Sequence, residues 1–106
     1  MLRSVQKQMD HDKCVESKAT EWKDDGYIVF ADVEGWNKPA EIEGYVPDIL
    51  ATKHGIARIC EVETEDTLES HRKQWETFKI YAEGIKGTSF WLFLAKEEGK
   101  CQYLKR

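Results

Sequence analysis

Residues 45–64 limit the possible folds of this chain more than any other stretch. They read Tyr-Val-Pro-Asp-Ile-Leu-Ala-Thr-Lys-His-Gly-Ile-Ala-Arg-Ile-Cys-Glu-Val-Glu-Thr. The apolar and β-branched residues predict two β-strands joined by a tight turn at His54-Gly55. Three acids interrupt these strands: Asp48 in the first, and Glu61 and Glu63 at the end of the second. Because a carboxylate among apolar neighbours is costly unless something neutralises it, we expect a compensating charge nearby.

The spacing of the three acids predicts a cation site. Glu61 and Glu63 are two residues apart, so their side chains should leave one face of the strand while Val62 points the other way. Pairing through the turn brings Asp48 near that acidic end. Carboxylates that converge on one patch suit a hard divalent cation such as Mg²⁺.

The remaining chain supplies two helices and further strands. We expect a helix from residue 2 to about residue 23, ended by Asp24-Asp25-Gly26, and a second from about Leu68 to Ala82. Residues 27–33 predict a strand, and residues 88–95 predict one that is buried on both faces. Residues 100–106 add an optional last strand at the sheet edge. The predicted order is helix, strand, strand, strand, helix, strand.

Two motifs in this order carry a family resemblance. Pro47-Asp48 followed by Glu61-Val62-Glu63 resembles the signature of the PD-(D/E)xK phosphodiesterase superfamily, with Glu63 where that family has lysine. Gln74-Trp75-Glu76-Thr77-Phe78 is similar to the Gln-hydrophobic-x-x-Tyr motif of its helicase-associated and phage-exonuclease branches, with Phe78 in place of tyrosine. The resemblance implies one restriction-endonuclease-like α/β domain over residues 1–106, with an αβββαβ core and a central mixed sheet flanked by helices.

The resemblance also implies roles for particular residues. Asp48, Glu61 and the backbone carbonyl of Val62 would hold Mg²⁺ or Mn²⁺, with help from Glu16 on the first helix; the other reading of Glu16 is a solvated helix residue. Gln74 would lie beside the metal and orient a phosphate or a ligand. Glu63 cannot offset negative charge as lysine does, so it would serve as a further ligand or as a base, since crowding raises the pKa of a carboxylate. The predicted catalytic set is Asp48, Glu61, Glu63 and Gln74.

Three functional hypotheses follow. The first is a metal-dependent nuclease that hydrolyses DNA, whether duplex, branched or single-stranded, as a homodimer or within a larger complex, because 106 residues leave no separate DNA-binding module. The second is a catalytically inactive nuclease-fold protein that serves as a nucleic-acid-binding or assembly subunit. The third is a small α/β protein whose acids merely pair with Arg58, Lys53 or Lys73.

Charge and cysteine content bear on partners and compartment. The net charge of −4 does not favour nucleic-acid binding, but residues 1–66 hold 15 Asp and Glu against 8 Lys and Arg, and bound cations would neutralise part of this excess. Three widely spaced cysteines argue against a disulfide framework or a zinc site, and predict buried thiols in a cytoplasmic, reducing setting. No apolar run approaches the roughly 20 residues of a membrane span. We therefore expect no membrane partner.

Overall fold

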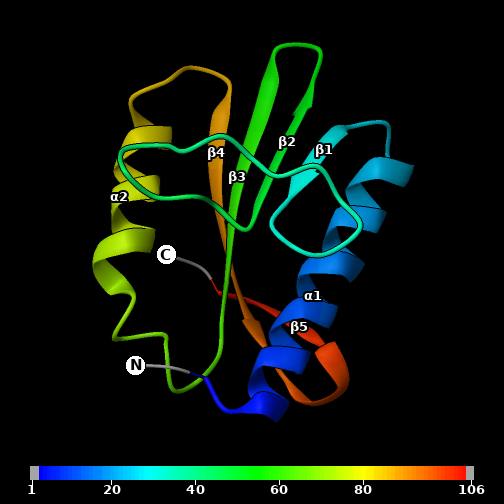
Figure 1. The fold of residues 1–106 in the computed structure, drawn as a ribbon. Coiled ribbons are helices and arrows are strands. Elements are labelled where there is room, and N and C mark those ends of the chain that lie inside the picture. The colour runs from blue at the N-terminus through cyan, green and yellow to red at the C-terminus, as the bar shows by residue number, and fades with distance from the viewer. Residues whose placement is uncertain (1–2, 105–106) are drawn as a thin grey trace.

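The computed structural model describes residues 3–104, which form a five-stranded sheet with a helix on each side (Figure 1). The strands lie in the order β1-β2-β3-β4-β5; β3 and β4 are parallel, and the other neighbouring pairs are antiparallel. The predicted α/β class, αβββαβ order and mixed sheet are confirmed. The elements are α1 (Val5–Asp24), β1 (Ile28–Ala31), β2 (Ile49–Lys53), β3 (Ile56–Glu63), α2 (Arg72–Glu83), β4 (Thr88–Ala95), a 3₁₀ turn (Glu97–Gly99) and β5 (Cys101–Leu104).

Helix α1 has defined signals at both ends. The Ser4 side chain accepts a hydrogen bond from the Lys7 amide and so caps the first turn. Gly26, with φ of 94°, turns the chain away after the last residue of the helix, as the sequence predicts. Residue 2, where we expect the helix to begin, lies outside the described residues.

The hairpin of β2 and β3 forms as predicted. Its turn residues His54 and Gly55 have φ of 47° and 81°, and both therefore lie in the left-handed region that two-residue hairpin turns require. Lys53 pairs with Ile56 across the turn, and Ile49 pairs with Cys60 at the far end. This register places Asp48, which directly precedes β2, next to Glu61.

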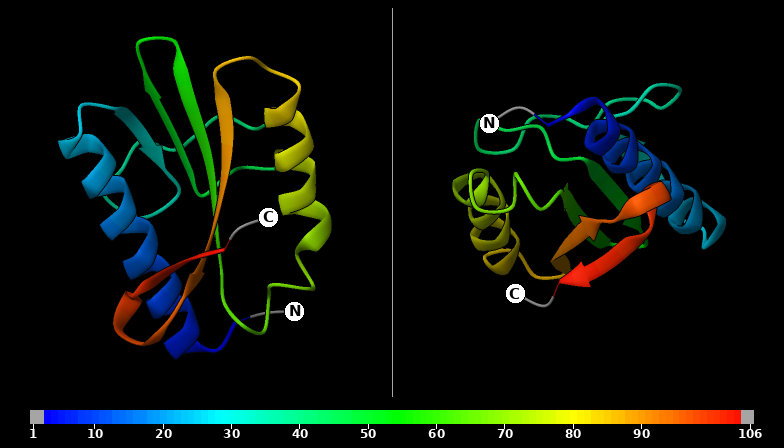
Figure 2. Two further views of the ribbon diagram at one scale, coloured as in Figure 1. Left: turned by 180° about the vertical axis from the view of Figure 1, so that it is seen from behind. Right: turned by 90° about the horizontal axis from the view of Figure 1, so that it is seen from below.

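The side chains of β3 alternate between two cores. Cys60 and Val62 belong to the cluster that α1 covers, whereas Ile59 packs with Phe78 of α2. Glu61 and Glu63 follow Ile59 at steps of two, so they share the α2 face. The prediction that the two glutamates leave one face and Val62 the other is confirmed. Figure 2 shows the two helices on opposite sides of the sheet when the molecule is seen from below.

Helix α2 begins later than predicted, at Arg72 instead of about Leu68. Residues 65–71 form consecutive turns, because the Thr67 hydroxyl donates a hydrogen bond to Glu63 and accepts one from the Thr64 amide. A threonine side chain that competes for backbone partners in this way favours turns over a helix. As a result, His71 stands at the N-terminus of α2 beside the end of β3.

The prediction of three free thiols is wrong for two of them. Cys14 of α1 and Cys101 of β5 form a disulfide; their Cα atoms are 5.5 Å apart, and they are 87 positions apart in sequence. An 87-residue separation gives no sequence signal for pairing. Cys60 is the buried free thiol we expect. Because disulfides form mainly in oxidising compartments, the cysteine argument for a reducing, cytoplasmic setting loses its basis. Within residues 3–104, neither helix has the length and apolar character needed to cross a membrane.

Candidate functional site

A cavity of about 200 Å³ lies at the carboxyl end of β3, between the first half of α1 and the start of α2. The structure brings all four predicted catalytic side chains to this one place, although they come from β3, α2 and the segment before β2. The residues that line the cavity are Arg3, Gln8, His11, Asp12, Asp32, Asp48, Glu61, Glu63, His71 and Gln74.

Asp48 and Glu61 hold each other through backbone amides. The Asp48 amide donates to Glu61 Oε1 at 2.9 Å, and the Val62 amide donates to Asp48 Oδ2 at 2.8 Å. Each carboxylate therefore accepts a hydrogen bond from the strand that carries the other. This reciprocal pair fixes the two side chains at the end of the β2–β3 hairpin and explains why acids are tolerated there.

Burial has the largest effect on the electrostatics of Glu61. It is 2% exposed, and burial raises its pKa well above the ordinary glutamate value, with the charges of Asp48 and Glu63 raising it further. The Asp48 amide and Gln74 Nε2, which donates to Oε2 at 2.9 Å, act in the opposite direction. Among the described residues, no lysine, arginine or histidine forms an ion pair with Glu61. Its negative charge is thus offset by dipoles alone.

Glu63 has a different environment. Its Oε1 accepts hydrogen bonds from Thr67 Oγ1 at 2.7 Å, His71 Nδ1 at 2.9 Å and Arg3 Nη2 at 3.1 Å. Burial raises the pKa of Glu63, while the Thr67 bond and the charge of His71 oppose that rise. Its Oε2 atom is buried without a hydrogen-bond partner in the described part of the chain. Three donors therefore engage Oε1, one of them the Arg3 guanidinium, and they hold the Glu63 side chain in place.

Arg3 joins the end of β3 to the segment before α1. Besides its bond to Glu63, Arg3 Nη2 donates to the Val62 carbonyl at 3.3 Å and to Thr67 Oγ1 at 3.2 Å, and its Nε donates to Thr64 Oγ1 at 3.1 Å. The side chain is largely buried. Arg3 thus places a fixed positive charge beside Glu63 at the cavity.

Gln8, His11 and Asp12 of α1 line the cavity, and His11 is the one that contacts Asp48. Its Nε2 lies 3.3 Å from Asp48 Oδ1, and its Nδ1 lies 2.8 Å from Asp12 Oδ1. Burial by itself would lower the pKa of His11, but the hydrogen bond and charge of Asp48 outweigh it, so the pKa is raised. Glu16, which we expect to take this role, is exposed and does not line the cavity. That prediction is wrong because the buried face of α1 runs through His11, Cys14 and Val15.

The basic partners named in the third hypothesis lie elsewhere. The Arg58 guanidinium lies over the rings of Trp22, Tyr27 and Trp91, at 4.5–5.0 Å from their centroids. Lys53 Nζ donates to the Asp25 carbonyl at 2.7 Å. Lys73 is exposed and does not line the cavity. The acids do have basic neighbours, but these are Arg3, His11 and His71.

Comparison with protein-family models and with curated protein sequences finds no match to this chain.

The donors in the cavity suit a divalent cation in part. Among residues 3–104, no three His, Cys, Asp or Glu side chains form a group that could hold a metal ion. Mg²⁺, however, is commonly bound through one or two carboxylates and keeps several waters. Asp48 and Glu61 make such a partial set of two carboxylates, whereas the Val62 carbonyl accepts a hydrogen bond from Arg3 in this structure.

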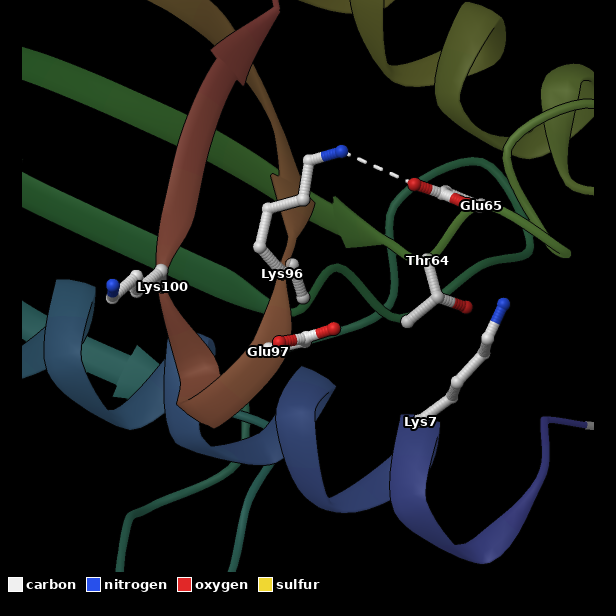
Figure 3. A pocket seen from close by; sticks show the side chains of 7 residues that line it. Lys7, Thr64, Glu65, Lys96, Glu97 and Lys100 are labelled. Carbon is white, nitrogen blue, oxygen red and sulfur yellow. Dashed lines mark hydrogen bonds and ion pairs between the residues drawn. The ribbon is translucent and has the colours of Figure 1, made fainter.

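A second, larger cavity of about 400 Å³ opens at the carboxyl end of β4. Figure 3 shows Lys7 and Lys96 extending from α1 and from the end of β4, with Lys96 Nζ 3.1 Å from a Glu65 oxygen. The cavity carries three lysines but also Glu65 and Glu97, and these side chains are half-buried or exposed. Thr64, which lines this cavity, accepts a hydrogen bond from Arg3, which lines the first one.

Sequence reasoning misses Arg3, His11 and His71. Each reaches the cavity by tertiary contact from outside the hairpin, with sequence separations of 60 for Arg3–Glu63 and 8 for His71–Glu63. A usable signal exists for His71, since it stands directly before the second helix and follows an acid-bearing strand. For Arg3 and His11 the sequence offers none.

Proposed function

We propose that this protein is a metal-dependent phosphodiesterase that hydrolyses DNA, in the manner of the PD-(D/E)xK superfamily. The observation that carries the proposal is the reciprocal Asp48–Glu61 pair, in which a fully buried carboxylate has two acidic neighbours and no cationic partner among the described residues. Such an arrangement is costly unless a cation joins it. Structural acids normally have that cost removed by a lysine or an arginine.

Asp48, Glu61 and the Val62 carbonyl would hold Mg²⁺ or Mn²⁺. A metal in this position supplies Lewis-acid stabilisation and lowers the pKa of bound water. The protein's own residues would orient the two carboxylates and neutralise negative charge at the site. Gln74 fixes one oxygen of Glu61, and His11 fixes one oxygen of Asp48. Arg3 provides a permanent positive charge that favours an incoming phosphate and the negative charge that develops on it.

We propose DNA as the substrate because lysines line the cavity beside the acidic site. Lys7, Lys96 and Lys100 line the neighbouring cavity (Figure 3) and would contact phosphates on either side of the cleaved bond. Because the net charge is −4, binding should be weak without the metal.

The test is cleavage of end-labelled DNA, offered as duplex, branched and single-stranded molecules with Mn²⁺ or Mg²⁺. Wild type should cleave at least one form, and Asp48→Asn and Glu61→Gln should not. Glu16→Gln, which changes an exposed acid of α1, is the matched control and should cleave normally. If wild type binds Mn²⁺ but cleaves none of the three forms, the nuclease assignment is wrong.

The second candidate is an inactive nuclease-fold protein that binds nucleic acid or serves as an assembly subunit. The observation in its favour is that His11 and Arg3 already partner Asp48 and Glu63. These contacts neutralise two of the three acids internally. On this alternative, DNA binding survives removal of divalent metal by chelation, and Asp48→Asn leaves it unchanged.

A further inference from the structure

We propose that His71 is the proton-transfer residue of this site and that Glu63 is the residue that positions it. This inference rests on the proposed phosphodiesterase function. It adds to that function a base that comes from the start of α2, outside the motif by which the sequence resembles a nuclease.

The geometry assigns the two nitrogens of His71 different roles. Nδ1 lies 2.9 Å from Glu63 Oε1, an oxygen that also accepts from Arg3 and Thr67. An acceptor held in this way requires a proton on Nδ1, so Nε2 carries the lone pair in the neutral ring. In proteins, a carboxylate often fixes the tautomer and orientation of a histidine, which leaves the other ring nitrogen ready to accept a proton.

His71 is also accessible to a reactant. Its side chain is 31% exposed, whereas that of Glu63 is 1% exposed. The ring lines the same cavity as Asp48 and Glu61. Glu63 itself is too enclosed to exchange protons with a substrate, which leaves His71 as the group that can.

The charged surroundings of His71 come from every element around the cavity. Glu63 of β3 contacts the ring directly, and Arg3 shares the same Glu63 oxygen. The neighbouring Arg72 is paired with Glu69 and Glu76 on the outer face of α2. The other titratable groups that line the cavity are His11, Asp12, Asp32, Asp48 and Glu61. Acidic groups therefore outnumber basic groups in the cavity.

The proposed step is balanced. The oxygen of a water molecule forms a bond to phosphorus while one of its protons passes to Nε2 of His71. The bond between phosphorus and the leaving oxygen breaks, and that oxygen takes a proton from solvent. His71 then releases its proton to solvent, which restores the starting state with one water consumed per bond cleaved.

The experiment compares wild type, His71→Ala, His71→Asn and Glu63→Gln in the cleavage of a labelled oligonucleotide across a range of pH. His71→Asn keeps a donor for Glu63 but has no basic nitrogen. Both His71 variants should lower kcat roughly 10²- to 10⁴-fold, the usual contribution of a general base, and lose the rise of activity with pH. Added imidazole should restore part of the activity of His71→Ala. Glu63→Gln should lower kcat and move the acidic limb of the profile to lower pH.

Two further measurements separate the possible failures. Mn²⁺ binding by calorimetry should be unchanged in both His71 variants, and circular dichroism should show that they are folded. His54→Gln, in the exposed hairpin turn, is the matched control and should behave as wild type. If wild type cleaves DNA and both His71 variants keep its rate and pH profile within about threefold, a margin far below a general base's contribution, the inference is overturned and the proposed function stands. If wild type neither binds Mn²⁺ nor cleaves, both are overturned.

Discussion

The Cys14–Cys101 disulfide should be the largest single contribution to the stability of this chain. It ties α1 to β5 across 87 residues of sequence. In the chain-entropy model, a loop of that length removes roughly 15 cal/mol/K from the unfolded chain, or about 4.6 kcal/mol at 25 °C. A domain of this size is typically stable by only about 5–15 kcal/mol. Reduction should therefore bring the protein close to its unfolding threshold.

Urea unfolding with and without a reductant measures this effect. With an m-value of roughly 1.5 kcal/mol/M, the midpoint should fall by about 3 M on reduction. Cys14→Ser, Cys101→Ser and the double variant should all lose about the same amount, because each breaks the same bond. Cys60→Ala is the control and should keep the sensitivity to reductant, since Cys60 is unpaired. Additive losses in the double variant, or a midpoint that does not respond to reductant, would refute the reasoning.

Three further predictions concern the cavity and its surroundings. Because the pKa of Glu61 is raised in the folded state, folding favours its protonated form, so the stability of the metal-free protein should fall as pH rises above the ordinary glutamate value. The raised pKa of His11 acts in the same direction at higher pH; urea unfolding at pH 5 and pH 8 should show the fall, and Glu61→Gln should reduce it. Gln74→Leu removes the donor to Glu61 Oε2 and should cost about 1.5–3 kcal/mol at pH 8 by urea unfolding, whereas Gln102→Leu on exposed β5 should cost little. Lys96→Glu combined with Lys100→Glu should weaken DNA binding, measured by fluorescence anisotropy against salt, without changing Mn²⁺ affinity; exposed Lys86→Glu is the control.

The fold could be predicted where local pattern and tertiary structure agree. The alternation of β3 places Glu61 and Glu63 on one face, and the His54-Gly55 turn fixes which residues face Asp48. The apolar run at residues 88–95 predicts β4 because a strand covered by helices needs no polar face. These features depend on residues close together in sequence.

The wrong or missing predictions concern features that contacts between side chains determine, which local sequence patterns do not show. The Thr67 hydroxyl donates to Glu63 and accepts from the Thr64 amide, so the expected first turn of α2 does not form. The buried face of α1 passes through His11 and leaves Glu16 in solvent, because the apolar stripe of that helix is irregular. The disulfide and the Arg3–Glu63 contact join residues 87 and 60 positions apart, which no local spacing indicates.

The central claim is that the Asp48–Glu61 pair exists to hold a divalent cation. A crystal structure of the protein grown with Mn²⁺, examined for anomalous density, tests it most directly. We expect one strong anomalous peak from Mn²⁺ between the Asp48 and Glu61 carboxylates, next to the Val62 carbonyl. If fully occupied Mn²⁺ appears only elsewhere, or the two carboxylates remain as described with no peak between them at saturating Mn²⁺, the claim is contradicted.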